Sequence, residues 1–280
     1  MKIFIINLEQ STDRLAQQQA QFERLGLTFE RLPAATVNDI SETFYLQNLK
    51  HGQRLIKQTE MACFLSHKRA WEKVAQENQP CVILEDDAVL VRDFAEILAQ
   101  IDALVNTPDN QLGGQMDLIN LEVYGRTKIV GKSSTVSLLD QQYQLIPLLL
   151  DKSGTGGYIL YPSGAKKLLK HAQSHFALAD AFIYHCPSLN MYQIEPAALL
   201  QDDKCALYGI AITHASNSMI GQIQNTISFQ PTLWQKIRFK KNRIITQISL
   251  GFRTIAALIQ GEKRQIDVNT DKFHTKSQQL

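Results

Sequence analysis

Residues 81–87 read Cys-Val-Ile-Leu-Glu-Asp-Asp, an apolar run that stops abruptly at three consecutive carboxylates, Glu85, Asp86 and Asp87. The apolar part predicts a short buried strand over 82–84. Three acidic side chains held together at a strand end repel one another, so the cluster favours a divalent cation that neutralises it. Oxygen ligands favour Mg²⁺ or Mn²⁺ over zinc, and these ions keep positions open for phosphate oxygens. The alternative interpretation is an exposed acidic turn that caps a helix starting near Asp93.

The segments around this strand predict an α/β fold with a mostly parallel central sheet. A strand over 2–7 is followed by a helix over 12–25, which Ser11 caps and Gly26 ends, and by a strand over 28–32. Strand, helix, strand is the opening of a parallel sheet. Further helices are expected over 39–49, 60–76 and 93–104, and further strands over 118–121 and 158–160. The acidic cluster then lies at the carboxyl end of a central strand, where open α/β sheets bind ligands.

The composition is that of a globular protein, because 44% of the 280 residues are hydrophobic and 20% are charged. This length fits one domain over 1–228 followed by a separate tail over 229–280. A net charge of only +2 argues against bulk affinity for nucleic acid. Four widely spaced cysteines without a C-x-x-C pair indicate neither a zinc knuckle nor a disulfide framework, which favours a reducing cytoplasm. The sequence contains no stretch of about 20 apolar residues, so we expect no membrane-spanning helix.

The tail from Trp234 to Arg264 predicts a basic amphipathic helix. Eight basic side chains in this stretch accompany a single acid, Glu262. The apolar residues recur at spacings compatible with one helical stripe, namely Trp234, Ile237, Ile244, Ile248, Phe252, Ile255 and Ile259. This pattern is typical of an anchor that lies in a membrane interface and is attracted by anionic lipids of the inner leaflet. The alternative is a helix packed on its own domain, with its charges solvated.

Four segments of the chain together resemble glycosyltransferase family 25, the group that contains bacterial lipooligosaccharide galactosyltransferases. They are Ile5–Leu8 with Ser11, Asp13 and Arg14; Glu60–His67 with Trp71, leading into Ile83–Asp87; Gly154–Ile159 with Gly164, Ala165 and Asp180; and Pro196–Gln201 with His214, Asn217 and Ser218. The resemblance covers about residues 1 to 225, and the second segment is its most specific part. It implies a GT-A-like fold, a nucleotide-sugar donor and transfer with inversion at the anomeric carbon.

The same resemblance implies substrates and a location. It predicts a hexosyltransferase that moves galactose from UDP-galactose to the oligosaccharide of a lipooligosaccharide. Because that acceptor is built on a lipid and the tail is basic, we expect a cytoplasmic enzyme held peripherally at the inner face of the cytoplasmic membrane. Its expected partners are the UDP-sugar, the lipooligosaccharide acceptor and anionic inner-leaflet lipids.

The resemblance also gives the acidic cluster a role. Residues 85–87 are similar to the acidic metal-binding motif of GT-A enzymes, in which Mn²⁺ or Mg²⁺ neutralises the charge of the departing nucleoside diphosphate. Asp87 is the expected direct ligand, with Glu85 next, because alternate residues of an extended strand share a face. Asp86 points away and would hold a ribose or sugar hydroxyl. His214 would complete the metal site, although a lone histidine is also explained without a ligand role.

Inversion in a single displacement requires a base that takes the proton of the acceptor hydroxyl. That base should be a carboxylate outside the metal cluster. We predict Asp180, which lies among apolar residues where burial raises the affinity of a carboxylate for protons. Bacterial family members typically have Pro-Val before the matching Asp, whereas this chain has Leu178 and Ala179. The alternative role for Asp180 is the N-cap of a short helix over 181–184.

The remaining candidates would contact the donor. Arg14, near the start of the first helix, would face its phosphates, or else is a solvated surface residue. Asn7 and Leu8 would contact uracil or ribose, mainly through their backbone. Thr155 and Gly156 belong to a small-residue segment that would let the backbone approach the transferred sugar, or that forms a plain tight turn.

Several other residues are weaker candidates. His67 is expected to be a satisfied core histidine or a substrate contact. Asp202 and Asp203 are expected to lie at the surface, or else near the acceptor. Residues 106–116 and 125–142, rich in Asn, Gly, Ser, Gln and Thr, are predicted to be loops near the site.

Two other functions stay open at this stage. Metal-dependent hydrolysis of a phosphate ester would also use an acidic cluster, but the chain lacks an N-terminal aspartyl nucleophile motif. A non-catalytic nucleotide-sugar-binding protein or membrane-associated scaffold would bind UDP without turning it over.

Overall fold

A mixed sheet of ten strands forms the centre of the computed structural model, which describes residues 1–105, 116–133, 136–152, 154–211, 227 and 229–273. The strands are β1 (Lys2–Asn7), β2 (Glu30–Pro33), β3 (Cys81–Glu85), β5 (Leu118–Asn120), β6 (Lys128–Gly131), β7 (Val136–Leu138), β8 (Tyr143–Leu150), β9 (Gly157–Leu160), β10 (Met191–Glu195) and β12 (Gly261–Arg264). Their order is β12-β6-β8-β10-β5-β9-β3-β1-β2, and β7 pairs with β8.

Most strands of this sheet run in one direction. Within the described residues, seven of the ten share the direction of β1, whereas β8, β9 and β12 run the opposite way. The predicted α/β fold with a mostly parallel sheet is therefore confirmed in strand direction. The sheet departs from a purely parallel one because β9 lies antiparallel between β3 and β5, and because β8 is antiparallel to each of its partners β6, β7 and β10. β12 is in turn antiparallel to β6.

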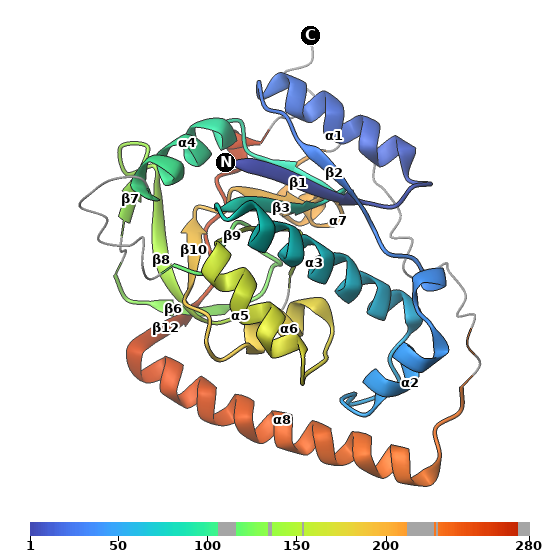
Figure 1. Ribbon diagram of the computed structural model, residues 1–280. Helices are drawn as coiled ribbons and strands as arrows, with labels where there is room; N and C mark the ends of the chain where they lie inside the picture. The colour runs from blue at the N-terminus through green and yellow to red at the C-terminus, as the bar shows by residue number, and fades with distance from the viewer. Residues whose placement is uncertain (106–115, 134–135, 153, 212–226, 228, 274–280) are drawn as a thin grey trace.

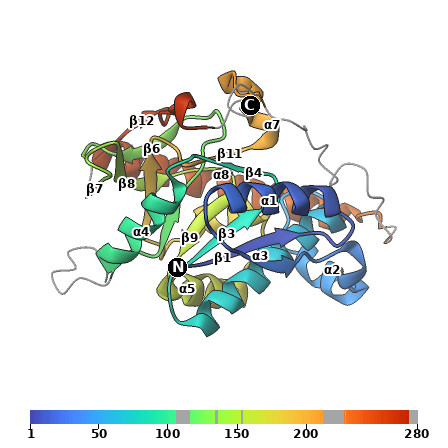
Figure 2. The ribbon, with the colours of Figure 1, turned by 90° about the horizontal axis from the view of Figure 1, so that it is seen from above.

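Helices cover both faces of the sheet. They are α1 (Thr12–Arg24), α2 (Glu42–Leu49), α3 (Gln58–Glu77), α4 (Phe94–Val105), α5 (Pro162–Ala172), α6 (Ala179–His185), α7 (Asp202–Cys205) and α8 (Leu233–Gln260), with short 3₁₀ turns η1 (Val37–Asp39), η2 (Ala206–Tyr208) and η4 (Thr270–Lys272). Figure 1 shows α1 and α4 on one face and α3, α5 and α6 on the other, while α8 runs along the outside of the molecule. The same layers are seen from above in Figure 2.

Local sequence signals account for the first helices. Gly26, in the left-handed region with φ +63°, follows α1, as predicted. The helix expected over 39–49 begins only at Glu42, as α2, and Asp39 belongs to the preceding turn η1. The hydroxyl of Ser41 accepts a hydrogen bond from Phe44 N and so caps the start of α2. α3 ends at Asn78, which adopts a left-handed conformation.

The packed aromatic side chains of α3 and α6 form part of the core. Phe64, Trp71 and Phe182 contact one another with ring centroids 5.0 to 5.7 Å apart. Trp71 is fully buried, as predicted, and its indole N–H donates to the hydroxyl of Tyr158 on β9. This contact ties the helix layer to the strand beside the acidic cluster.

The segment predicted as a loop over 125–142 contains two strands, β6 and β7, so that prediction is wrong for those residues. The apolar residues of β6 are buried against β8 instead of facing a ligand site. Most of the other predicted loop, 106–116, lies outside the described residues.

The C-terminal segment is bound into the main sheet. Its strand β12 pairs antiparallel with β6, and Arg264 forms a two-point ion pair with the buried Glu195 at the end of β10. The domain boundary between residues 228 and 229 stays a prediction. Within the described part of the chain, no helix is long and apolar enough to cross a membrane.

Gly164 on α5 lies directly against the sheet, and its replacement tests this packing. A Cβ atom there would lie 2.3 Å from the carbonyl oxygen of Asp117, a backbone atom that cannot move freely. We therefore expect Gly164→Ala to reduce the free energy of unfolding by about 1–3 kcal/mol. Gly251→Ala on α8 is the matched control, because nothing lies within 4 Å of its Cβ position and helix propensity favours alanine by about 1 kcal/mol. Urea unfolding midpoints should shift in opposite directions for the two variants.

Candidate functional site

A pocket of about 360 Å³ opens at the carboxyl ends of β1 and β3. The pocket wall is formed by the loop after β1, the first turn of α1, the turn η1 and the amino-terminal half of α3. The three carboxylates also line it. The lining residues include Leu8, Arg14, Val37, Cys63, His67 and Glu85–Asp87. Its size is in the range of small-molecule sites. The predicted position of the acidic cluster, at the carboxyl end of a central strand, is confirmed.

Glu85 is held firmly by its neighbours. Its Oε1 accepts hydrogen bonds from Thr155 Oγ1 at 2.5 Å and from His67 Nε2 at 3.2 Å, and its backbone N–H donates to the carbonyl of Gly156. Burial alone would raise the pKa of Glu85, but the contacts with His67 and Thr155 outweigh it and lower that pKa. Glu85 is therefore a fixed, ionised carboxylate at the pocket wall.

Asp86 turns toward β1 and α1, where Arg14 pairs with its charge and Asn7 donates a hydrogen bond to it. Asn7 Nδ2 donates to its Oδ2 at 2.7 Å, and the Arg14 guanidinium lies 2.8 Å from its Oδ1. Asn7 is buried, and its own Oδ1 accepts from Arg31. The structure thus brings three predicted site residues together, but as a mutually bonded cluster. Their contacts to ribose and phosphate stay predictions.

Asp87 differs from both neighbours, because its Oδ1 is buried without a hydrogen-bond partner among the described residues. Burial raises its pKa well above the ordinary value, and the negative charges of Glu85 and Asp202 add to this effect. β3 ends at Glu85 and residues 86–87 form a turn, so the predicted strand alternation does not extend to Asp87. A buried carboxylate without a partner fits a bound cation.

Asp202 lies beside Asp87, and its predicted surface position is wrong. A two-stranded sheet of β4 (Ala88–Leu90) and β11 (Leu199–Gln201) brings the segment after β11 back to the acidic cluster. The backbone N–H of Asp202 donates to the carbonyl of Asp87 at 3.0 Å, and Asp202 is buried. Asp203 instead is exposed and pairs with Lys204, in agreement with the surface prediction.

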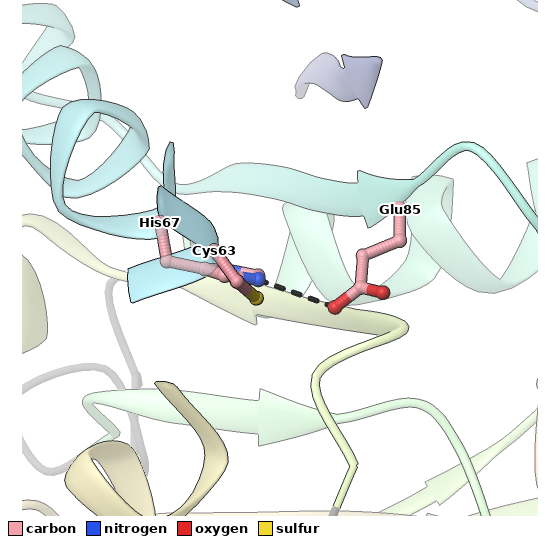
Figure 3. Close-up of side chains that lie close together, drawn as sticks. All are labelled: Cys63, His67 and Glu85. Carbon is pink, nitrogen blue, oxygen red and sulfur yellow. Dashed lines mark hydrogen bonds and ion pairs between the residues drawn. The ribbon is translucent and has the colours of Figure 1, made fainter. Parts of the chain in front are cut away.

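Figure 3 shows Cys63, His67 and Glu85 converging from α3 and β3. His67 is buried between Glu85 and the Tyr158 hydroxyl, which lies 3.0 Å from its Nδ1, so the core-histidine prediction is confirmed. The Sγ atom of Cys63, a ring nitrogen of His67 and a carboxylate oxygen of Glu85 all lie within 4.8 Å of one another. Burial raises the pKa of the Cys63 thiol well above the ordinary value. A protonated thiol is a poor ligand for Mn²⁺ or Mg²⁺, so the carboxylates are the better donors here.

The small residues before β9 make room for a buried carboxylate that the sequence analysis missed. A Cβ on Gly154 would lie 2.5 Å from Glu122 Oε1, and one on Gly156 would lie 2.8 Å from Glu122 Oε2. The Glu122 carboxylate accepts from the N–H of Gly156, and burial raises its pKa well above the ordinary value. The space beside these glycines is therefore filled by the protein's own side chain. Sugar contacts by Thr155 and Gly156 stay predictions.

A signal for Glu122 was present in the sequence. Glu122 follows β5 with only Leu121 between them. Asp86 and Asp87 follow β3 in a similar way. β9 separates β5 from β3 in the sheet, and these two strands run in the same direction. Their carboxyl ends therefore lie at the same edge, which places Glu122 near Glu85.

Asp180 lies on α6, within electrostatic reach of Glu85 and His67. The helix begins at Ala179 with Leu178 as N-cap, so the alternative in which Asp180 is the N-cap is wrong. Its Oδ1 accepts from the N–H of Ala181 at 2.6 Å. Burial raises the pKa of Asp180 above the ordinary value, which is the property expected of a base. His214, the last predicted ligand, lies outside the described residues.

Comparison with known proteins agrees with this site. The model of "Glycosyltransferase family 25 (LPS biosynthesis protein)" matches residues 1–183, which include β1, the acidic cluster and Asp180. The chain belongs to glycosyltransferase family 25. The family 25 resemblance seen in the sequence is thereby confirmed, and glycosyl transfer is the activity of this family.

Relatives within family 25 span most of the chain. The lipooligosaccharide biosynthesis protein lic2B of Haemophilus influenzae is 23% identical over 71% of this chain and 75% of its own length. The lacto-N-neotetraose biosynthesis glycosyltransferase LgtE of Neisseria meningitidis serogroup B is 25% identical over 79% of each chain. A glycosyltransferase 25 family member of Anopheles gambiae is 29% identical over 60% of this chain, which corresponds to 28% of its length.

Proposed function

We propose that this protein transfers galactose from UDP-galactose, with inversion, to the oligosaccharide of a lipooligosaccharide. The observation that carries this proposal is the buried Oδ1 of Asp87, which has no hydrogen-bond partner among the described residues and lies in the pocket at the carboxyl ends of β1 and β3. The acceptor class is supported by the similarity to lic2B, which by its name acts in lipooligosaccharide biosynthesis, and to LgtE, which by its name is a glycosyltransferase of lacto-N-neotetraose biosynthesis.

The donor would lie in the pocket between β1, α1 and α3. Leu8 offers an apolar contact at the pocket wall, where a nucleobase or ribose can bind. Arg14 lies on the same wall, and its guanidinium is already oriented by Asp86. An oriented guanidinium suits a diphosphate, because its planar donors match phosphate oxygens.

A divalent cation would be held by Asp87, with Glu85 as the second carboxylate. The buried, unpartnered Oδ1 of Asp87 and an all-oxygen donor set fit Mn²⁺ or Mg²⁺. When bound, such an ion neutralises the charge that develops on the leaving UDP. His67 and Thr155 keep Glu85 ionised and in place, so the protein orients one donor before any ligand arrives.

Asp180 would act as the base. It lies outside the acidic cluster on α6, and it does not belong to the lining of the donor pocket. An acceptor hydroxyl that approaches from the side of α6 would meet Asp180 as it attacks the anomeric carbon, and the carboxylate would take its proton. Its raised pKa makes it a stronger base than an ordinary aspartate.

Release of the nucleoside diphosphate from a panel of UDP-sugars tests the proposal. The purified protein is assayed with and without Mn²⁺, and with and without a delipidated lipooligosaccharide acceptor. We expect release from UDP-galactose only when both metal and acceptor are present. Galactosyl product with the opposite anomeric configuration to the donor, read by NMR, would support inversion.

Other outcomes identify the alternatives. Metal-dependent release that needs no acceptor would favour a hydrolase. Binding of UDP without release from any donor would favour a non-catalytic donor-binding scaffold. Acceptor-dependent release from a different UDP-sugar would retain the transferase and change its donor.

A further inference from the structure

The long helix α8 contacts the rest of the molecule through one narrow face. Phe239 and Ala257 on that face are buried, and Leu250 packs with the apolar side chains of β6 and β8. Two polar contacts add to this attachment: Asn242 donates to the carbonyls of Lys50 and Gly52, and Arg253 donates to the carbonyl of Tyr184. At 100° per residue, Phe239, Leu250 and Ala257 fall within an arc of about 20°.

The opposite face of α8 is apolar and exposed. Ten large apolar side chains of this helix are solvent-exposed, namely Leu233, Trp234, Ile237, Ile244, Ile245, Ile248, Phe252, Ile255, Leu258 and Ile259. Trp234 is 78% exposed, Phe252 71% and Ile259 74%. At the same helical period they occupy an arc of about 140°, centred opposite the packed face. A stripe of this length on a soluble protein marks an interaction surface.

The charge of α8 indicates what covers this stripe. The helix contains six basic residues and no acidic one, whereas the whole chain carries only +2, so the other residues together carry −4. Lys236, Arg238, Lys240, Lys241 and Arg243 are all exposed and lie in the amino-terminal half. At the same helical period, Lys236, Arg238 and Lys240 lie at or beside the edges of the apolar arc. Lys241 lies within the arc, and Arg243 lies toward the packed face. An apolar stripe with a cationic border is complementary to a bilayer interface that contains anionic lipids.

We propose that the outward face of α8 binds the surface of a bilayer rich in anionic lipids, with the helix lying in the plane of the interface. Pairing with a second copy through the same face would place two helices of charge +6 against each other, which is unfavourable. A bilayer instead solvates the apolar side chains and attracts every basic residue. The proposal stands independently of the transferred sugar.

This orientation has a consequence for the rest of the molecule. Figures 1 and 2 show α8 outside the helix layer of α5 and α6, with its amino-terminal end beside α2. The basic half of the helix is attached to the loop after α2, which leads directly into α3 and the pocket wall. The protein would therefore lie with its α3–α5–α6 side toward the membrane.

Flotation with lipid vesicles tests the proposal. The full chain is mixed with vesicles of phosphatidylcholine alone or with about one third phosphatidylglycerol, and the bound fraction is measured after centrifugation. We expect binding to the anionic vesicles that weakens at high salt. Trp234 fluorescence should shift to shorter wavelength on binding, whereas the other tryptophan, Trp71, is already buried.

Two adjacent positions provide matched variants. Ile248→Glu with Phe252→Glu should reduce binding at least about tenfold, because two large apolar side chains leave the interface. Ser249→Glu adds a negative charge one residue away from Ile248 but outside the stripe, and it should reduce binding much less. Unchanged thermal unfolding would show that both proteins are folded, whatever their transferase activity.

Three results would overturn the proposal. In the first, the wild-type protein does not float with anionic vesicles. In the second, it binds neutral vesicles as strongly as anionic ones. In the third, the Ile248→Glu, Phe252→Glu protein still binds anionic vesicles. A concentration-dependent dimer in light scattering that the double substitution dissolves would assign the stripe to a second copy instead.

Discussion

Asp87→Asn should lower the rate of sugar transfer about 10³-fold at saturating donor. The amide keeps the shape of the side chain but removes the negative charge that would hold the proposed cation, and a cation at a leaving diphosphate stabilises the transition state by several kcal/mol. The variant should also lose the Mn²⁺-dependent increase in UDP affinity, measured by calorimetry. Steady-state UDP release gives the rate.

The same substitution is expected to stabilise the metal-free protein. Burial raises the pKa of Asp87 above its unfolded value, so the ionised side chain opposes folding at neutral pH. Asp87→Asn removes this penalty and should raise the midpoint of thermal unfolding by about 2–4 °C, the shift that about 1 kcal/mol produces in a chain of this size. This gain in stability should be complete at pH values above the raised pKa of Asp87 in the folded protein. It should vanish as the pH falls below the ordinary carboxyl pKa, because Asp87 is then protonated in both the folded and the unfolded wild type.

Asp203→Asn is the matched control for both measurements. Asp203 is exposed, is one residue from Asp202, and pairs only at the surface with Lys204. Its replacement should leave the transfer rate and the unfolding midpoint unchanged. Full transfer activity of Asp87→Asn would contradict the metal role of Asp87, and a lower midpoint would contradict the destabilising effect of its charge.

Asp180→Asn should reduce kcat by about 10²–10⁴-fold, the usual contribution of a general base. Donor affinity should stay unchanged, because Asp180 does not line the donor pocket. In the wild type, kcat should fall as the pH decreases through the raised pKa of Asp180, since the protonated carboxyl cannot accept the acceptor proton. This acidic limb should therefore lie above the ordinary aspartate pKa.

The variant and the pH profile together test the base assignment. The residual activity of Asp180→Asn should no longer show the acidic limb. A variant with wild-type kcat would place the base elsewhere, and Glu122, a buried carboxylate that interacts electrostatically with Glu85, would be examined next. Loss of UDP affinity would show that the substitution disturbs the pocket and not the proton transfer alone.

The local elements of the first half of the chain were predictable from the sequence. The apolar run 82–84 forms a strand, and Gly26 follows the end of α1 through its own backbone preference. Ser11 occupies the N-cap position of α1, although its side chain makes no capping hydrogen bond. The 3.6-residue period of α8 likewise predicted a helix with an apolar stripe. The short strands β4, β6, β7, β11 and β12 were missed, because three or four residues contain too little periodicity to distinguish a strand from a loop. The longer strands β8 and β10 were missed as well.

The sequence by itself determined that three carboxylates follow a buried strand, and family 25 membership follows from their pattern with the neighbouring motifs. Only the tertiary structure decided the separate environments of the three carboxylates. Pairing between β4 and β11 brings Asp202 to Asp87, and the antiparallel insertion of β9 brings Thr155 to Glu85 and Gly156 to Glu122. These partners are more than 30 residues apart in the chain. The protonation and ion binding of a carboxylate depend on its burial and on the charges around it, and distant strands supply both only after they pair.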